Sequence, residues 1–379
     1  MRLFLVLVGA AALRPAPAPR AAPRRIQGVR HAAGKQPEAA GVPNALRLAA
    51  LCTVPVAWGT YAPAVRYVYS QPVAPPGVVF SAAYYVVALA TLSAALWLGD
   101  RGDRGDGAAV DVGAAGSGGA DAAGAELGGY LFLGNILQVT GLESTGADTA
   151  AFLVQLTTIF VPLLEGVVFK RAIPARTLAS CALAFSGCLV LLGSDATAAA
   201  SPSTSNLQGD LLIVAAAVCY SAHVLRLGAL SKAIRPLELA VSKAKYETLF
   251  GISSIAVLLA ATPAVEIRTF FAAVETLPAS DWATLLRAVA WCGGVTCAYT
   301  IWAQSFGQQS IRPARANLIY SSQPIFSAVF AALLLDEQPT AAIGVGGAFI
   351  LGAIFYEVSG DDGNDDGLVA AAERPTTRE

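Results

Sequence analysis

Charged residues and histidines are scarce in this chain, and the shortage excludes several classes of function. Only 13% of the 379 residues are charged, whereas a soluble globular domain has about 25%. The two histidines, His31 and His223, are too few for a multi-histidine metal site, and the chain has no H-E-x-x-H motif. It also has no P-loop lysine motif for ATP-driven pumping and no basic block with interleaved aromatic residues for nucleic-acid binding. We therefore expect no multi-histidine metal site and no nucleic-acid partner.

Hydrophobic residues, in contrast, make up 55% of the chain. The six cysteines fall in apolar segments without C-x-x-C spacing, which indicates small apolar helix residues and not a disulfide framework. A helix of about 20 apolar residues crosses a bilayer, and hydropathy predicts ten such segments. The sequence therefore predicts an all-α polytopic membrane protein with ten transmembrane helices. The predicted spans are 48–69, 77–98, 125–142, 149–169, 174–193, 210–230, 245–263, 282–306, 313–335 and 340–358.

The first 46 residues are predicted to be a targeting leader. The apolar run Leu3 to Leu13 is too short to span a membrane and follows a basic start, which is typical of a signal peptide. The next stretch, 14–47, is rich in Ala, Pro and Arg, as in a transit peptide. Together they favour the plastid envelope. The alternative is a plain basic cytosolic tail, which leaves another endomembrane or the plasma membrane open.

One segment of the chain has a related second copy 166 residues later, with identical residues at several equivalent positions. An apolar segment follows each copy, and the first then ends in Lys170-Arg171 and the second in Asp336-Glu337. Such a duplication predicts two related halves, 47–194 and 209–358, with a linker at 195–208 and an acidic disordered tail at 359–379. The matching pairs are Gly141 with Gly307, Ser144 with Ser310, Ala150 with Ala316, and Phe160 with Phe326.

Basic residues predict how the two halves are inserted. With alternate loops assigned to alternate sides, twelve basic residues fall on one side and three on the other. Such a bias favours an even number of spans with both termini on the positive side. Because each half has five spans, the second half enters the membrane upside down, as in inverted-repeat transporters. The twelve are Arg101, Arg104, Lys170, Arg171, Arg176, Arg226, Lys232, Arg235, Lys243, Lys245, Arg312 and Arg315, and the three are Arg66, Arg268 and Arg287.

Four short motifs, in the same order as in a known family, strengthen this interpretation. They are Ala57-Trp58-Gly59-Thr60-Tyr61, Gly134-Asn135-Ile136-Leu137-Gln138 with Gly141-Leu142-Glu143, Thr149 to Pro162, and Pro313 to Pro339. Over residues 48–358 the chain resembles the EamA family of the drug/metabolite transporter superfamily. The resemblance implies a carrier with alternating access, no catalysis and no cofactor, and a substrate held near the midplane between the halves. One departure is the second span, where Val79 to Tyr85 lacks the arginine that many relatives carry.

Two polar stripes are the main candidates for a substrate pathway. Polar residues recur on one helical face of the fourth span and on the matching face of the ninth. Since polar groups facing lipid are costly, both stripes are expected to face the bundle interior. The alternative is that they only hydrogen-bond neighbouring helices. The stripes are Asp148, Gln155, Thr158, Pro162 and Glu165, and Asn317, Tyr320, Ser321 and Pro324.

Three members of these stripes carry more specific hypotheses. Pro162 and Pro324 lie in mid-span, where each removes a backbone donor and favours a kink or hinge. A tolerated kink without function is the alternative. Glu165, if it faces the interior at depth, would couple proton entry to transport. Its closeness to Lys170 favours an interfacial position instead.

Other candidates lie outside the stripes. Aromatic residues within spans favour either a cavity wall or an interfacial belt. Lys243, Lys245 and Arg315 are candidate anion contacts or membrane anchors, and Lys243 is spaced to pair with Glu247. His223 is interpreted as a satisfied structural histidine. Gly344, Ala348 and Gly352 are interpreted as a close helix contact, inside the bundle or between protomers. The remaining pathway candidates are Trp58, Gln138, Tyr220, Tyr246, Tyr299 and Gln323, and Trp291 and Trp302 complete the aromatic set.

These observations favour a secondary transporter of small metabolites, with a small-molecule substrate and the lipid bilayer as partners and a monomeric or homodimeric state. The alternative is an anion exchanger of the sugar-phosphate or nucleotide-sugar type. A membrane-embedded enzyme or assembly factor would need a nucleophile–base pair or a metal cluster, and the spans supply neither. A channel is also disfavoured, because no segment predicts a selectivity filter.

Overall fold

The computed structural model describes residues 42–105, 115–142, 144–145, 147–170, 172–198, 207–261, 263–275, 277–335 and 341–360, and its regular elements there are all helices. This confirms the predicted all-α class. Most of the predicted leader, residues 199–206 of the linker, the turn Asp336-Glu337 and the tail from 361 lie outside the described residues. The helices of the first half are α2 (Asn44–Gly59), α3 (Tyr61–Tyr69), α4 (Gly77–Gly105), α5 (Ala115–Leu142), α6 (Ala147–Val154), α7 (Thr157–Phe169) and α8 (Ala175–Ala198). Those of the second half are α9 (Leu207–Leu230), α10 (Pro236–Ala261), α11 (Val265–Val274), α12 (Ala279–Trp291), the π-helix η1 (Cys292–Tyr299), α13 (Thr300–Gly307), α14 (Pro313–Tyr320), α15 (Gln323–Leu335) and α16 (Ala341–Ser359).

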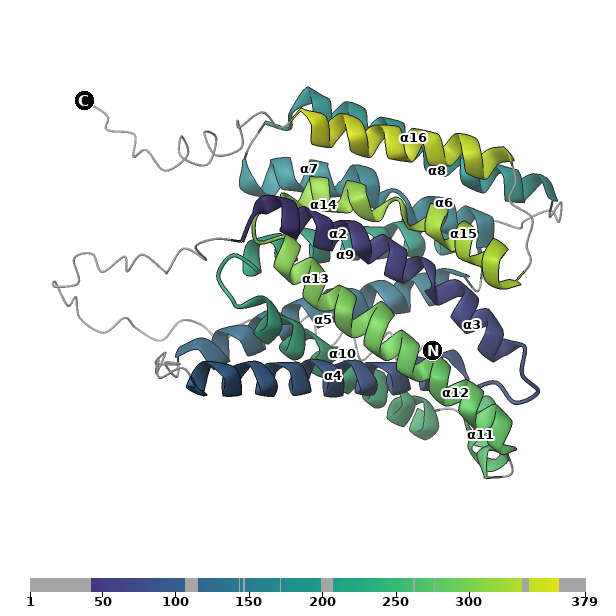
Figure 1. The fold of residues 1–379 in the computed structure, drawn as a ribbon. Helices are drawn as coiled ribbons and strands as arrows, with labels where there is room; N and C mark the ends of the chain where they lie inside the picture. Colours follow the sequence, from purple (N-terminus) through teal and green to yellow (C-terminus); the bar gives the residue numbers. More distant parts are fainter. Residues whose placement is uncertain are drawn as a thin grey trace, which may run out of the picture.

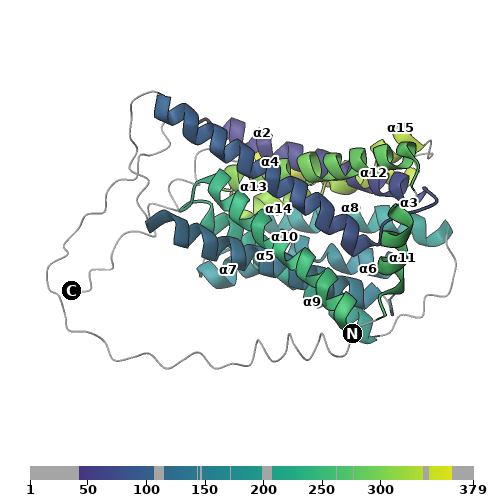
Figure 2. The ribbon, with the colours of Figure 1, turned by 90° about the horizontal axis from the view of Figure 1, so that it is seen from below.

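The helices lie side by side in one bundle (Figure 1). The start of α2, the α7–α8, α9–α10 and α13–α14 turns and the end of α16 all lie at the left end of the bundle in Figure 1. Helices α8 and α16 pack on each other along one face, and α4, α5 and α10 form the opposite face, seen from below in Figure 2. Between them, Leu51 and Val54 of α2 form a buried core with Ile319 of α14.

Seven segments of the described chain are long and apolar enough to cross a membrane, and α8 holds a shorter apolar stretch, Ala175–Leu191. The predicted spans 125–142 and 282–306 are not among them; they correspond to α5 and to α12 with η1 and α13. These helices hold glycines and polar residues that lower their hydropathy. The seven are Asn44–Tyr69, Gly77–Arg101, Thr149–Phe169, Leu207–Leu230, Pro236–Ala261, Pro313–Leu334 and Ala341–Ser359.

Helix α10 begins nine residues before the predicted span at 245–263, and the difference matters for the site. Pro236 occupies its first position and Glu238 its first turn, where a missing N–H costs little and a negative charge is favourable. Lys243 and Lys245 therefore lie inside the helix and not at its entrance. The start of the span was predicted too far along the sequence because four charged residues between 238 and 247 lower the hydropathy of this part of the helix.

The fourth and ninth predicted spans are each interrupted, and at matching places. Helix α6 ends at Val154 and α7 begins at Thr157, while α14 ends at Tyr320 and α15 begins at Gln323. The two breaks are related by the same offset of 166 residues. Pro324 lies in the first turn of α15, where proline is tolerated. Pro162 lies inside the continuous helix α7, so the break in this span precedes the predicted hinge.

Gly344, Ala348 and Gly352 of the last helix do not make the predicted close contact inside the bundle with the described residues, and a contact between protomers stays a prediction. A Cβ added at Gly344 or Gly352 would meet no neighbouring atom within 4 Å, and Ala348 is exposed. The close contact lies instead between Gly346 of α16 and Gly187 of α8, where a Cβ on either would meet the other's carbonyl oxygen at 2.6 Å. Small residues do mediate the packing, on the neighbouring face of the helix.

Candidate functional site

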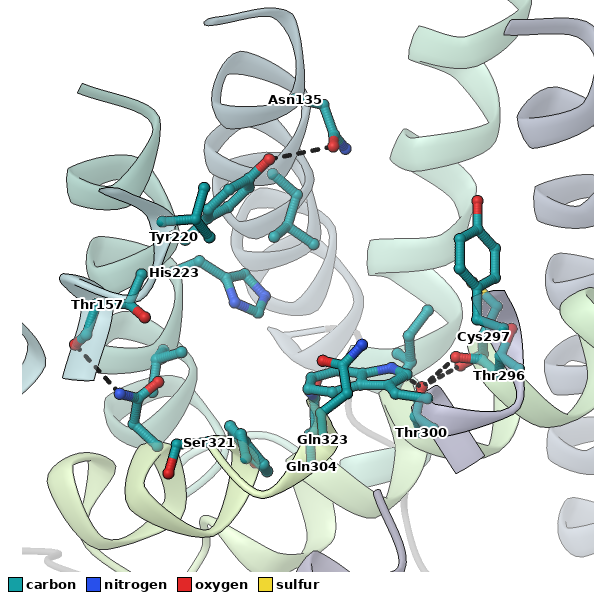
Figure 3. Close-up of a pocket in the computed structure, with 18 of the residues that line it drawn as sticks. Asn135, Thr157, Tyr220, His223, Thr296, Cys297, Thr300, Gln304, Ser321 and Gln323 are labelled. Atoms are coloured by element: carbon teal, nitrogen blue, oxygen red, sulfur yellow. Dashed lines mark hydrogen bonds between the residues drawn. The ribbon is translucent and has the colours of Figure 1, made fainter. Parts of the chain in front are cut away.

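A cavity of about 540 Å³ lies between the two halves of the chain (Figure 3). Helices α2 to α7 supply its lining from the first half, and α9, α10, η1 and α13 to α15 supply it from the second. This volume lies in the range of small-molecule sites. Eleven predicted residues line it: Trp58, Gln138, Gln155, Thr158, Tyr220, Lys243, Asn317, Tyr320, Ser321, Gln323 and Pro324.

The two helix breaks meet at this cavity. Gln155 and Thr158 line it from the α6–α7 break, and Ser321 and Gln323 line it from the α14–α15 break. Asn317 Nδ2 donates to the backbone oxygen of Thr157 at 3.1 Å, which joins the two broken segments across the halves (Figure 3). Thr158 is 1% exposed, and its hydroxyl has no hydrogen-bond partner among the described residues. The breaks therefore bring polar side chains to the cavity wall, and the Thr158 hydroxyl is unsatisfied among the described residues.

A second polar wall lies between α5 and α9. The Tyr220 hydroxyl donates to Gln138 Oε1 at 2.8 Å, and Asn135 Oδ1 lies 3.1 Å from the same hydroxyl. Gly134 makes room for the tyrosine ring, because a Cβ at this position would lie 2.5 Å from Tyr220 Cε1. In the motif that begins at Gly134, the glycine therefore leaves space for the Tyr220 ring, and the two amide side chains contact the Tyr220 hydroxyl.

Aromatic rings form much of the remaining wall. Trp58 Nε1 donates to Thr300 Oγ1 at 3.2 Å, and the Trp58 ring meets the Tyr320 ring edge-on with 5.4 Å between centroids. Tyr61, Tyr84 and Tyr85 also line the cavity, although the sequence did not single them out as site residues. Aromatic residues in apolar spans show no period that separates a lipid-facing from a cavity-facing ring. The only signals were the place of Tyr61 in the first-span motif and the tyrosine pair in the second span.

Charged groups occupy the α10 side of the cavity. Lys243 Nζ lies 3.9 Å from Glu247 Oε1, and the two side chains are 3% and 4% exposed. The predicted pairing is thus confirmed, while the anchoring interpretation of Lys243 is wrong because the residue is buried. His223 also lines the cavity, with Nε2 buried and without a partner among the described residues. It is therefore not the satisfied structural histidine expected from the sequence.

Glu165 lies outside the cavity lining, contrary to its predicted place on the pathway. Its carboxylate accepts hydrogen bonds from Arg312 Nε at 3.1 Å and from the backbone N–H of Ala314 at 2.9 Å. Both donors belong to the start of α14, where a negative charge is favourable. Glu165 therefore joins the end of α7 to the start of α14, and its geometry gives no support to proton entry through the cavity. Pro162, one turn earlier, is buried and does not line the cavity either.

Four further candidates lie away from the cavity. Lys245 Nζ and the Tyr246 hydroxyl bind the Asp121 carboxylate at 2.5 and 2.9 Å, and these hydrogen bonds lower the pKa of Asp121. The Tyr299 hydroxyl lies 2.6 Å from Thr53 Oγ1. Arg315 is absent from the described cavity lining. Trp291 and Trp302 are likewise outside the lining.

Comparison with known proteins places this architecture in a family. One protein crystal structure superimposes with a TM-score of 0.63 at 16% identity, over 85% of this chain and 100% of the other, which shows a shared fold. No curated protein matches the sequence. The model of the EamA-like transporter family matches twice, over residues 46–193 and 207–357. The two repeats and the apolar helices make this a multi-pass integral membrane protein. The chain belongs to the EamA-like transporter family, as its motifs indicated.

Proposed function

We propose that this protein is a secondary transporter that carries a small metabolite across a membrane by alternating access. The observation that carries the proposal is the cavity of about 540 Å³, because residues of both family repeats line it. A site between two repeats changes its exposure when one repeat rocks against the other. The polar groups of both helix breaks would hold the substrate while the repeats move.

The proposed topology is ten spans in two inverted five-helix units. Two features support it. The helix ends that the positive-inside count assigns to one side all lie at the left end of the bundle in Figure 1. The equivalent Ser144 and Ser310 lie in turns before α6 and α14, which run in opposite directions along the bundle. In this arrangement α5, α12 and α13 also cross the membrane, and the cavity lining includes Asn135 and Gln138 of α5 and Thr300 and Gln304 of α13.

Contacts between α7 and α14 would act as a gate in this mechanism. Glu165 holds Arg312 and Ala314, and Asn317 holds Thr157, so both contacts join one half to the other. Opening the cavity on that side requires these contacts to break. A substrate that binds the closed and open states with different affinity shifts the balance between them.

An anion exchanger of the sugar-phosphate or nucleotide-sugar type is the second candidate. Lys243 favours it, because its ammonium group is buried in the cavity wall. Glu247 disfavours it, since its carboxylate lies 3.9 Å from the lysine nitrogen and would repel a second anion. The structure thus favours a substrate without net negative charge.

Uptake by purified protein in sealed liposomes would test both candidates. The panel holds amino acids, sugar phosphates and nucleotide sugars, each measured with and without a pH gradient and against protein-free liposomes. Saturable uptake of one class is expected, and the difference made by the gradient reports coupling to protons. Folded protein that moves no compound in either condition would contradict the proposed function. A fluorescent fusion of residues 1–50 would separately test plastid targeting.

A further inference from the structure

The ion pair in the cavity is incompletely satisfied. The 3.9 Å between Lys243 Nζ and Glu247 Oε1 is too long for a hydrogen bond. Glu247 Oε2 is buried and has no hydrogen-bond partner among the described residues. A buried ion pair repays its desolvation only when hydrogen bonds satisfy the remaining donors and acceptors. Among the described residues, the pair therefore leaves an ammonium group with free donors and a carboxylate with a free acceptor, in the wall of a cavity large enough for a small molecule.

The surroundings of the pair add no other full charge among the described lining residues. His223 of α9 lies close enough to Lys243 for an electrostatic interaction, and Tyr85 of α4 and Cys297 of η1 lie near Glu247. The other polar lining residues are amides, hydroxyls and the Trp58 indole. The fixed charges facing a ligand are thus one lysine and one glutamate, one helical turn apart on α10.

This arrangement opposes ligands that carry only one sign of charge. An anion drawn to Lys243 meets the Glu247 carboxylate, and a cation drawn to Glu247 meets the Lys243 ammonium. At such short distances in a poorly solvated site, repulsion between like charges is strong. A ligand with one acidic group and one ammonium group satisfies both. Its acidic group takes the free donors of Lys243, and its ammonium group donates to Glu247 Oε2.

We propose that Lys243 and Glu247 form a charge filter that selects zwitterionic substrates, with His223 Nε2 as an additional polar contact. The inference rests on the proposed transport function and names the substrate class of the same cavity. The two residues are four positions apart, a rise of about 6 Å along α10, and their charged groups lie 3.9 Å apart. A small zwitterion therefore fits along the α10 wall, and the rest of the molecule faces the tyrosines and Trp58.

Three compounds that share a phenyl ring test the filter directly. Phenylalanine is the zwitterion, 2-phenylethylamine the matched cation and 3-phenylpropionate the matched anion. A second series of leucine, 3-methylbutylamine and 4-methylpentanoate repeats the comparison on an aliphatic scaffold. Binding to the purified full chain is measured by ligand-induced thermal stabilisation and by competition for uptake in liposomes. We expect each zwitterion to bind about 30-fold or more tightly than its singly charged analogues.

Two single variants shift this preference in opposite directions. Glu247→Gln leaves the lysine charge and is expected to improve binding of the anions by about tenfold relative to the zwitterions. Lys243→Gln leaves the glutamate charge and is expected to favour the cations to a similar extent. Lys245→Gln and Glu238→Gln are matched controls on the same helix, because neither residue lines the cavity. Both controls are expected to keep the wild-type order.

The double variant Lys243→Gln with Glu247→Gln guards against a folding defect in the single variants, because it leaves no unpaired buried charge. It is expected to lose the preference for zwitterions without gaining one for either ion. Uptake of singly charged compounds in preference to zwitterions by the wild type would overturn the filter while leaving transport intact. An unchanged order of ligands in folded variants would overturn it as well. A wild type that takes up no compound of any charge would contradict the proposed function itself and the filter with it.

Discussion

The position of Tyr220 depends on the absence of a side chain at Gly134. A Cβ at residue 134 would lie 2.5 Å from the tyrosine ring, so Gly134→Ala must displace the ring and its contacts with Asn135 and Gln138. We expect the substitution to lower stability by about 1–3 kcal/mol, as overpacking does, and to reduce uptake. The measurement is a thermal unfolding midpoint together with an initial uptake rate.

Gly129 provides the control for this prediction, since it lies on the same helix and a Cβ there would meet no atom within 4 Å. Gly129→Ala is expected to keep uptake and to raise stability by up to about 1 kcal/mol through helix propensity. If both alanine variants behave alike, the steric account of Gly134 fails.

Glu165 carries a second prediction about a single side chain. Glu165→Gln removes the charge that holds Arg312, and hydrogen bonds to charged groups contribute about 1.5–3 kcal/mol. We expect the α7–α14 contact to weaken and the cavity to open more often. A cysteine at Ser321, which lines the cavity, should then react faster with a soluble maleimide.

The exposed Glu266, on α11, supplies a charge-matched control: Glu266→Gln should leave the labelling rate unchanged. Because Glu165 does not line the cavity, any pH dependence of uptake should persist in Glu165→Gln. Loss of that dependence, with labelling unaltered, would instead restore a proton-coupling role.

The sequence predicted the helices that carry the site better than the partners of their side chains. Polar residues at helical spacing identified the cavity-facing sides of the fourth and ninth spans, because that face follows from periodicity alone. Periodicity gives no information on which distant residue a side chain meets. Glu165 was therefore assigned to the pathway, although it contacts Arg312, 147 residues later. The breaks at Gln155 and Ser321 were likewise missed, because the kinks were predicted at the neighbouring Pro162 and Pro324.

In helix α10, in contrast, the partner of Lys243 was predicted correctly, but its buried position was not. Hydropathy places charged residues at the edges of a membrane helix, and so Lys243 was expected at an interface. The buried position is tolerated because Glu247 lies on the same face one turn later. Such a pair can be recognised by its i,i+4 spacing, but its depth depends on where the helix begins. That start is set by Pro236 and by packing against α4 and α5.

The contact between α8 and α16 supports a prediction about helix packing. Gly346→Ala places a methyl group 2.6 Å from the Gly187 carbonyl oxygen, so we expect a loss of about 1–3 kcal/mol. Gly344→Ala, on the open face of α16, should be neutral or slightly stabilising. Thermal unfolding in one detergent compares the two. Equal midpoints would mean that α8 and α16 separate easily enough to accept the methyl group.

In the described parts of the chain, the two repeats share their architecture and differ in their chemistry. Both family matches contain a broken helix, and the breaks meet at the cavity. Only the second repeat supplies fully charged residues to the described lining, Lys243 and Glu247. Duplication thus accounts for the shared helical frame around the cavity. Divergence between the copies accounts for the groups that would distinguish one substrate from another.

The proposed inverted arrangement predicts that two equivalent serines lie on opposite sides of the membrane. Ser144 precedes α6 and Ser310 precedes α14, and they match at the offset of 166 residues. If the repeats are inserted in opposite directions, cysteines at these two positions must face opposite sides of the membrane. In a cysteine-free background and sealed vesicles of one orientation, an impermeant maleimide should label only Ser310→Cys or only Ser144→Cys.

Reversing the vesicles should reverse which variant is labelled, and permeabilised vesicles should label both. Lys232→Cys, in the turn between α9 and α10, provides a marker for the positive side, and it should follow Ser310→Cys. Labelling of both serine variants from one side would require a parallel repeat, with an even number of spans in each half. Such a result would also place the basic turns on both faces of the membrane, against the charge bias that the positive-inside tendency explains.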